Sequence, residues 1–268
     1  MKNLEIYCVT NKSIKFLEKT GYKLAAVGRE KFSEKYIKCN KKKNIFYKEK
    51  YYSELTFHYW FWKNLLGKKK NNLWIGFCQK RRFWLQNKNS SSNLLSSVPS
   101  NWKNYDAVIC KKINLGKPKL SKIFKRGWKN IIHKPSILYS DRSYNIELHF
   151  DLFHGFRNLQ KAAKLVKKED RLEFIEYIRN NKSFNPHIMC VAKPKILKLW
   201  FKDLFSWLKR CETVFGFKDL KGYDTTRLYA YLAERYHSFW FKKYSTYIEW
   251  PYKFIDTEKN KSLKKLIF

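Results

Sequence analysis

Short apolar runs, each closed by polar or basic residues, recur along the chain. They are rich in β-branched and aromatic side chains, a composition typical of buried strands. Four of these runs predict strands, at residues 4–9, 73–78, 105–110 and 187–192. The segment between the first two runs is basic and irregular up to residue 50.

Two segments repeat their apolar residues at helical spacing. Ser53 is expected to cap a helix that runs to residue 66, with Glu54 in its first turn, where the helix dipole favours a carboxylate. This helix is apolar on all sides, which is typical of a helix buried between layers. Pro194 opens a strongly amphipathic helix. Strand, helix and strand at this spacing predict an α/β sheet.

Three further segments complete the predicted organisation. Residues 145–181 have a helical pattern, and Asp224 is expected to cap a last helix that runs to about residue 241. Residues 113–144 are basic, contain Gly and Pro, and have no sustained period. They are therefore predicted to form a long loop, and loops of that length often act as functional lids.

Size and hydropathy narrow the class of protein. The chain has 268 residues, of which 44% are hydrophobic, so it has enough apolar surface for a core and is not disordered throughout. No run approaches the roughly 18 consecutive apolar residues of a membrane span. The apolar run at residues 4–9 is too short for a signal peptide. We expect a soluble protein that stays in the cytoplasm.

Familiar chemical motifs are missing from the sequence. The six cysteines are far apart and include no CxxC pair, which argues against a zinc ribbon and favours reduced, buried thiols. P-loop, GxGxxG, HExxH and GxSxG patterns are absent, which weakens kinase, dehydrogenase and hydrolase interpretations. A strict D-x-D triplet, which often holds a divalent cation in nucleotide-sugar enzymes, is absent too.

The net charge of +36 indicates an anionic partner. Nucleic acid, acidic lipid headgroups, nucleotide-sugar phosphates and acidic glycans all fit this charge. Part of the lysine excess also fits the drift of an AT-rich coding sequence. The charge therefore predicts a negatively charged partner but does not distinguish among these classes of partner.

A few polar residues stand out by their position. Arg81 and Arg82 follow a predicted central strand, where ligands of open α/β sheets bind, and guanidinium groups suit a diphosphate. Glu54 fits a hydrogen bond to a ribose or sugar hydroxyl, or it only stabilises its helix. His149 and Asp151 fit an acid/base pair. Each of these residues is at least as compatible with a purely structural or solvated role.

Two other positions leave similar alternatives. Asn185, just before a predicted strand, fits either a contact with a sugar hydroxyl or a turn cap. Glu234 and Arg235 fit a buried ion pair that supports the core at least as well as they fit a substrate contact.

Several segments together resemble a bacterial family of capsular-polysaccharide and O-antigen glycosyltransferases. Its hallmark YCELTxxYWxWKN is similar to YSELTFHYWFWKN at residues 52–64, and its xIGLxHYRRYF is similar to IGFCQKRRF at residues 75–83. YDAVICKK, FNPHIM and RLYAYLAER follow in the family's order. Two departures are Gln79-Lys80 in place of the family's His-Tyr, and the lack of its Gly near Tyr229.

This resemblance implies a GT-A-like single domain at residues 1–241, with a mixed central sheet, flanking helices and a helical C-terminal portion, followed by a basic tail at 242–268. It implies transfer of a sugar, of galactose or galactofuranose type, from a nucleotide diphosphate donor to a surface-polysaccharide acceptor. A UDP-sugar is the expected co-substrate, and a divalent metal is not expected. A basic nucleic-acid-binding protein without catalysis is the alternative, and a membrane-surface adaptor is a more distant one.

The resemblance also implies roles for particular residues, with Arg81 and Arg82 neutralising the departing diphosphate in place of a metal. The implied donor-binding residues are Thr10, Asn11, Lys12, Glu54, Lys63, Arg81, Arg82 and Asp106. The candidate general bases are, in order, Asp151, His149 and Asp224. The implied acceptor- or sugar-binding residues are Asn185, His187 and Arg227.

The implied location is the inner face of the cytoplasmic membrane, where the protein would bind peripherally to reach a lipid-linked glycan. Anionic headgroups attract the basic chain, and the tail at 257–268 combines lysines with four apolar residues as a short amphipathic element. Docking of these apolar residues back onto the protein is the alternative.

Overall fold

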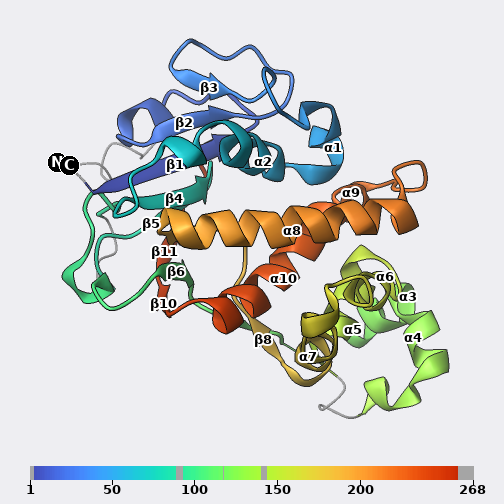
Figure 1. Cartoon of the computed structure of the whole chain (residues 1–268). Coiled ribbons are helices and arrows are strands. Elements are labelled where there is room, and N and C mark those ends of the chain that lie inside the picture. The colour runs from blue at the N-terminus through green and yellow to red at the C-terminus, as the bar shows by residue number, and fades with distance from the viewer. Residues whose placement is uncertain (1–2, 89–92, 117, 140–143, 259–268) are drawn as a thin grey trace. The chain divides into compact units, whose positions relative to one another are not determined.

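The computed structural model describes residues 3–88, 93–116, 118–139 and 144–258 (Figure 1). The chain divides into two compact units. The first consists of Met1–Lys111, His187–Asp203 and Trp240–Phe268, and the second of Lys112–Pro186 and Leu204–Phe239. Helices α8 (Pro194–Phe215) and α10 (Leu228–Tyr244) each contribute residues to both units.

The first unit is built on one nine-stranded sheet. Its main path runs in the order β10-β6-β9-β4-β1-β2-β3, and β5 joins β4 to β11. The strands are β1 (Leu4–Thr10), β2 (Lys23–Ala26), β3 (Tyr36–Lys38), β4 (Trp74–Gln79), β5 (Arg82–Trp84), β6 (Ala107–Cys110), β9 (Cys190–Ala192), β10 (Tyr247–Trp250) and β11 (Tyr252–Phe254).

Along the main path of this sheet most neighbours are parallel: β1 pairs in parallel with β2 and β4, β2 with β3, and β6 with β10. Strand β9 runs antiparallel to both β4 and β6, and β5 runs antiparallel to β4 and β11. The predicted α/β class with a mixed central sheet is confirmed. Since β1 and β4 are parallel neighbours, the residues that follow both strands meet at the same edge.

Short helices connect these strands. They are η1 (Leu17–Lys19), η2 (Phe46–Lys48), α1 (Glu49–Tyr52), α2 (Leu55–Asn64), η3 (Leu66–Lys68) and η4 (Ser100–Trp102). The apolar α2 packs on the sheet: the ring of Phe61 lies 4.9 Å from that of Tyr7 on β1 and 5.3 Å from that of Phe77 on β4. The expected burial of this helix is thus confirmed, since Leu55, Phe57 and Phe61 are fully buried.

The second unit is mainly helical. It contains β7 (Ile113–Asn114), α3 (Leu120–Arg126), α4 (Trp128–His133), η5 (Pro135–Leu138), α5 (Ile146–His154), α6 (Asn158–Ala163), α7 (Lys168–Asn180), β8 (Ser183–Phe184) and α9 (Tyr223–Thr226). Strands β7 and β8 pair antiparallel. The indole of Trp207, in the part of α8 that belongs to this unit, donates to the carbonyl of Ala162 at 2.8 Å.

Three local predictions are wrong. Residues 113–144 do not form one long loop: their described part contains α3, α4 and η5, because Ile123 and Ile137 are buried against Leu148 and Leu152 of α5. The region of the last helix contains α9 and then α10, so Asp224 lies inside a short helix rather than at a cap. The irregular segment before residue 50 contains β2 and β3.

The structure also shows the state of the cysteines and part of the C-terminal segment. All six cysteines are free and buried. Residues 247–254, in the segment assigned to the tail, form β10 and β11 of the large sheet, whereas the amphipathic residues 259–268 lie outside the described part of the chain. Within the described residues, no helix is long and apolar enough to cross a membrane.

Candidate functional site

Polar residues of the first unit gather at the edge where β1 and β4 end. Val9 pairs with Gln79 in the parallel register, so the turns after both strands are at the same level. In the first turn the hydroxyl of Thr10 donates to the carbonyl of Lys12 at 2.7 Å and accepts from its backbone N–H at 3.0 Å. This double contact fixes the turn that carries Asn11 and directs Lys12 out of the sheet edge.

Three cations at this edge converge on one carboxylate. The oxygens of Glu258 lie 2.8 Å from the ammonium nitrogen of Lys80, 3.1 Å from that of Lys12 and 3.2 Å from the guanidinium group of Arg81. Asp256 lies 3.5 Å from Arg81. The hydrogen bonds from Lys80 and Lys12 lower the pKa of Glu258 to about 2. The edge therefore holds an anionic group at the point where the three cations meet.

The segment that carries Glu258 is held to the sheet by backbone contacts. The N–H of Ile255 donates to the carbonyl of Arg81 at 2.9 Å, and the hydroxyl of Thr257 donates to that of Lys80 at 3.1 Å. Asp256 and Glu258 were not among the predicted site residues. Only their position directly after β11, which itself was not predicted, would have pointed to them.

A second group of contacts at the same edge links Glu54, Gln79 and Arg82. The amide of Gln79 donates to Glu54 at 2.5 Å, and Arg82 donates to the side-chain oxygen of Gln79 at 3.1 Å. The side-chain amide of Gln79 thus donates to an acidic residue and accepts from a basic one. A neutral imidazole, which has one donor nitrogen and one acceptor nitrogen, can make the same two contacts. Gln79 can therefore replace the family's histidine as a positioning group, although it cannot transfer a proton.

The prediction that Ser53 caps α2 is wrong. Ser53 follows α1 with a φ of 51°, its backbone N–H donates to Glu49, and Glu54 takes the N-cap position without a side-chain cap. This turn frees the carboxylate of Glu54 from its own helix and directs it to Gln79.

Two predicted donor-binding residues lie elsewhere in the first unit. Asp106 precedes β6, and the register of β6, β9 and β4 places it near the start of β4, at the opposite edge. There Asp106 accepts from Lys193 at 2.9 Å, which lowers its pKa, and lines a cavity of about 640 Å³. Lys63 is exposed near the end of α2, about nine residues or ~13 Å from Glu54, and lies over the ring of Trp62.

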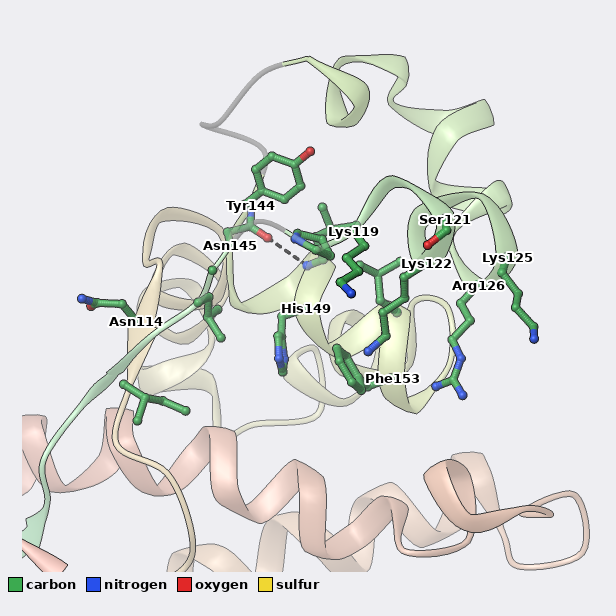
Figure 2. Close-up of a pocket in the computed structure, with 16 residues that line it drawn as sticks. Asn114, Lys119, Ser121, Lys122, Lys125, Arg126, Tyr144, Asn145, His149 and Phe153 are labelled. Carbon is green, nitrogen blue, oxygen red and sulfur yellow. Dashed lines mark hydrogen bonds between the residues drawn. The ribbon is translucent and has the colours of Figure 1, made fainter.

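The second unit has its own cavity, of about 640 Å³, bounded by β7, α3 and α5 (Figure 2). Its walls are mainly apolar, with Leu148, Leu152 and Phe153 on the α5 side. Four cations line it, and no Asp or Glu is among the lining residues: these cations are Lys119, Lys122, Lys125 and Arg126. Partial burial lowers the pKa of Lys122, whose ammonium group lies 3.3 Å from the centroid of the Phe153 ring.

His149 lines this cavity in a defined protonation state. The guanidinium group of Arg235 lies 3.3 Å from Nδ1, and because arginine only donates, Nδ1 is the acceptor and Nε2 carries the hydrogen. Burial, with the nearby charge of Arg235, lowers the pKa of His149 to about 3. The imidazole is therefore neutral at physiological pH and acts as a hydrogen-bond donor rather than as a base.

The other two candidate bases have different surroundings. Asp151 is buried and accepts from Asn130 at 2.7 Å and from the backbone N–H of Arg157 at 2.9 Å. Burial raises its pKa to about 6. Asp224 is partly exposed and lies 2.7 Å from the guanidinium group of Arg126, one of the residues that line the cavity. Of these two aspartates, only Asp224 thus forms its ion pair with a residue that lines the cavity.

The residues assigned to the acceptor have different surroundings. Asn185 is fully buried, and its backbone N–H and side-chain oxygen both bond the hydroxyl of Ser238, so it ties β8 to α10 within the second unit. His187 belongs to the first unit, has a φ of 66° and lies 3.3 Å from the hydroxyl of Tyr252. Arg227 directly follows α9.

Arg235 has a structural role in the second unit. Arg235 is almost fully buried and forms the expected ion pair with Glu234, while its guanidinium group lies 3.9 Å from the ring of Phe184.

The described residues contain no group of three or more His, Cys, Asp or Glu side chains placed to hold a metal ion.

Most of the chain matches a known family. The chain belongs to the DUF4422 family, described as a domain of unknown function, whose model matches residues 5–245. No curated protein sequence is significantly similar to the chain.

Two solved structures are similar to this one. WbbM, a bifunctional glycosyltransferase in its apo form, superposes with a TM-score of 0.70 at 18% identity over 94% of this chain. The chain spans 45% of the length of WbbM. This match confirms the GT-A-like fold. Core-mannan synthase A of Aspergillus fumigatus, in its Mn/GDP form, is 11% identical over 90% of this chain and 70% of its own, with a TM-score of 0.35.

Proposed function

We propose that the protein is a glycosyltransferase that moves a sugar from a nucleotide diphosphate donor to a surface-polysaccharide acceptor. The GT-A-like fold that it shares with WbbM, a bifunctional glycosyltransferase, supports this class of reaction. The proposed donor is a UDP-sugar of galactose or galactofuranose type, and the proposed acceptor is a capsular or O-antigen glycan.

One observation carries the proposal: Lys12, Lys80 and Arg81 converge on a single carboxylate at the edge where β1 and β4 end. Ligands of α/β sheets bind beyond the carboxyl ends of the parallel strands. A diphosphate in the place of the Glu258 carboxylate would meet the same three cations. They would stabilise the negative charge that develops on the leaving diphosphate, a role that metal ions fill in other enzymes.

The remaining donor contacts are assigned to the same edge. Glu54, partly exposed and oriented by Gln79, is suited to accept hydrogen bonds from ribose or sugar hydroxyls. Asn11 follows β1 and lies close to Gly28, where an added Cβ would come within 3.6 Å of the Asn11 side chain. We leave Asp106 and Lys63 out of the donor site because Asp106 lies at the opposite edge and Lys63 at the far end of α2.

The acceptor is assigned to the cavity of the second unit. Its four cations suit an acceptor that carries a phosphate or another anionic group, and His149 presents a donor N–H to it. We assign the general base to Asp224, because Arg126 of the cavity wall holds its carboxylate while Asp151 is committed to two structural hydrogen bonds. This assignment reverses the order that the sequence favoured.

The location at the inner face of the cytoplasmic membrane is part of the same proposal, since a lipid-linked acceptor would be found there. The basic tail at 257–268 was assigned to this contact, and residues 259–268 of it lie outside the described residues.

Binding and turnover with the full chain test the proposal. UDP and a panel of UDP- and GDP-sugars are titrated by calorimetry, and transfer is followed with a radiolabelled donor. Arg81→Ala should reduce transfer by roughly 100- to 1,000-fold, the usual cost of removing one donor of an oxyanion-type site. Lys35→Ala, which removes an exposed lysine paired with Glu18, is the control and should leave both readouts unchanged.

Two results would contradict this function. One is full activity in Arg81→Ala with a folded protein. The other is binding of single-stranded oligonucleotides in place of nucleotide sugars, which would favour the nucleic-acid-binding alternative.

A further inference from the structure

Helices α3 and α4 of the second unit expose large apolar side chains instead of burying them. Leu120 and Phe124 lie one turn apart on α3, and Trp128 and Ile132 lie one turn apart on α4, each between 51% and 65% exposed. Eleven large hydrophobic side chains are exposed among the described residues, and six of them lie between residues 113 and 139. Apolar exposure of this kind is concentrated here, and such concentration marks an interaction surface.

These exposed residues are not the ones that hold the helices in the fold. Ile123 of α3 is fully buried and Ile131 of α4 is partly buried, and both pack in the cluster with Leu148 and Leu152 of α5. Each helix therefore has an inner apolar face that is used and an outer apolar face that meets solvent.

The charge around this outer face is of one sign. From residue 107 to residue 140 the sequence has nine Lys or Arg and no Asp or Glu. Lys125 and Lys129 are exposed beside Phe124 and Trp128, and the ammonium group of Lys129 lies 5.5 Å from the centroid of the Trp128 ring. Exposed apolar side chains flanked by lysines are the composition of elements that lie in the interface of an anionic bilayer, where tryptophan is favoured.

We propose that α3 and α4 form a membrane-docking surface, made of Leu120, Phe124, Trp128 and Ile132 with Lys125 and Lys129, and that its partner is an anionic lipid bilayer. A second copy of the chain fits poorly, because two surfaces of like charge repel. Single-stranded nucleic acid fits less well, because the aliphatic Leu120 and Ile132 provide no face for base stacking.

In this proposal α3 contributes to both the cavity and the membrane-docking surface. Its residues Lys122 and Arg126 line the cavity assigned to the acceptor, while Leu120 and Phe124 are exposed to solvent. Docking would place α3, which forms one wall of that cavity, at the lipid headgroups. The membrane contact itself does not depend on sugar transfer, since nucleotide binding is measured without lipid and vesicle binding without nucleotide.

Vesicle co-sedimentation of the full chain tests the surface. The protein should bind vesicles of phosphatidylcholine with phosphatidylglycerol, ignore pure phosphatidylcholine, and dissociate as salt is raised. Replacing Leu120, Phe124, Trp128 and Ile132 together by Ser should weaken binding at least tenfold. Lys125→Glu with Lys129→Glu should weaken it by more than tenfold, since each basic residue near the surface contributes roughly fivefold.

Matched controls separate this surface from the rest of the protein. Leu172→Ser removes a side chain of α7 in the same unit that is 74% exposed, and it should leave vesicle binding unchanged. Deletion of residues 259–268 should reduce binding only in part. If that deletion alone abolishes binding, or if the Ser and Glu variants bind like the parent protein, the proposal is wrong.

Tryptophan quenching by brominated phosphatidylglycerol places the contact at one residue. Of the ten tryptophans, eight are buried, Trp62 is half-buried and Trp128 is exposed. Vesicle-bound protein should therefore lose part of its fluorescence, Trp128→Phe should abolish that loss, and Trp62→Phe should retain it. Equal quenching in Trp128→Phe, or binding of single-stranded oligonucleotides without any vesicle binding, would overturn the proposal.

Discussion

The ammonium nitrogen of Lys12 lies 3.1 Å from a carboxylate oxygen of Glu258, although 246 residues separate the two in the sequence. Together with Lys80 and Arg81, this contact places an internal anion where the proposed diphosphate would bind. A free ligand has to displace that anion, so the strength of this ion-pair cluster should set part of the donor affinity.

Glu258→Gln should therefore tighten the binding of UDP. Exposed ion pairs contribute about 0.2–1 kcal/mol each, so freeing three cations should lower the dissociation constant by at least about threefold. Calorimetric titration with UDP measures it. Glu18→Gln is the matched control, because its carboxylate is equally exposed and pairs with Lys35 elsewhere in the first unit. Weaker binding in Glu258→Gln would mean that Glu258 supports the ligand instead of competing with it.

The two aspartates of the second unit should respond differently to amide substitution. Asp224→Asn should lower kcat by at least about 100-fold with little change in Tm, since a general base contributes roughly 10²- to 10⁴-fold. Asp151→Asn should lower Tm, because an amide cannot accept from both Asn130 and the N–H of Arg157 without misplacing a donor. Transfer assays and thermal unfolding of both variants distinguish the roles, and a selective loss of kcat in Asp151→Asn would restore Asp151 as the base.

Sugar transfer should survive chelation. Lys12, Lys80 and Arg81 already supply positive charge at the proposed diphosphate position, so no added cation is needed to stabilise the leaving group. The measurement is turnover after dialysis against EDTA, with Mn²⁺ or Mg²⁺ added back. If turnover stops and the metal restores it, this reasoning is wrong and Asp256 and Glu258 become candidate ligands.

Acid should destabilise the second unit through His154, which is buried, and His149, which is partly buried. Burial lowers the pKa of His149 to about 3 and of His154 to about 4, from 6.5. As pH falls below 6.5 the unfolded chain binds protons that the folded chain does not, so the free energy of unfolding decreases, by up to about 1.4 kcal/mol per pH unit for each group. Asp151 has the opposite effect on the free energy of unfolding. Between its ordinary pKa of 3.8 and its folded pKa of about 6, the folded state keeps a proton that the unfolded chain releases, so stability rises as pH falls through this range.

The pH effect can be isolated with one variant. His149→Asn keeps a side-chain oxygen that can accept from Arg235 but does not titrate. The difference in unfolding free energy between the parent protein and His149→Asn should therefore shrink as pH falls from 6 to 4, which urea denaturation at each pH measures. Parallel pH profiles for the two proteins would show that His149 titrates normally.

Close packing explains why a glycine stands at position 76, in the segment that resembles the glycosyltransferase motif, and a stability measurement can test this. A Cβ on Gly76 of β4 would lie 2.4 Å from Cδ1 of Ile6 and 2.9 Å from Cγ2 of Val191, both in the buried sheet. Gly76→Ala should therefore cost about 1–3 kcal/mol of unfolding free energy. Gly67→Ala is the control, because nothing lies within 4 Å of its added Cβ, and it should cost less than Gly76→Ala. Equal effects in urea denaturation would contradict this explanation.

The sequence by itself determined the elements whose side chains carry a strong local pattern. The runs that became β1, β4, β6 and β9, together with α2 and α8, are apolar enough that burial decides their state wherever they pack. The residues after β4 were then recognisable as a candidate anion site, because ligands of open α/β sheets bind beyond strand ends, whereas the turn after β1 was assigned to the donor through the resemblance. The resemblance motifs of β4 and α2 lie in these same strongly patterned elements.

Tertiary structure decided what depends on partners far away in the sequence. Strands β2, β3, β10 and β11 lack a sustained apolar run of their own and form because neighbouring strands pair with them, so no local pattern predicts them. The register of β6 with β9 moved Asp106 to the opposite edge, and the segment after β11 brought Glu258 to Lys12. Contacts of this kind are set by long-range strand pairing, which a window of neighbouring residues does not contain.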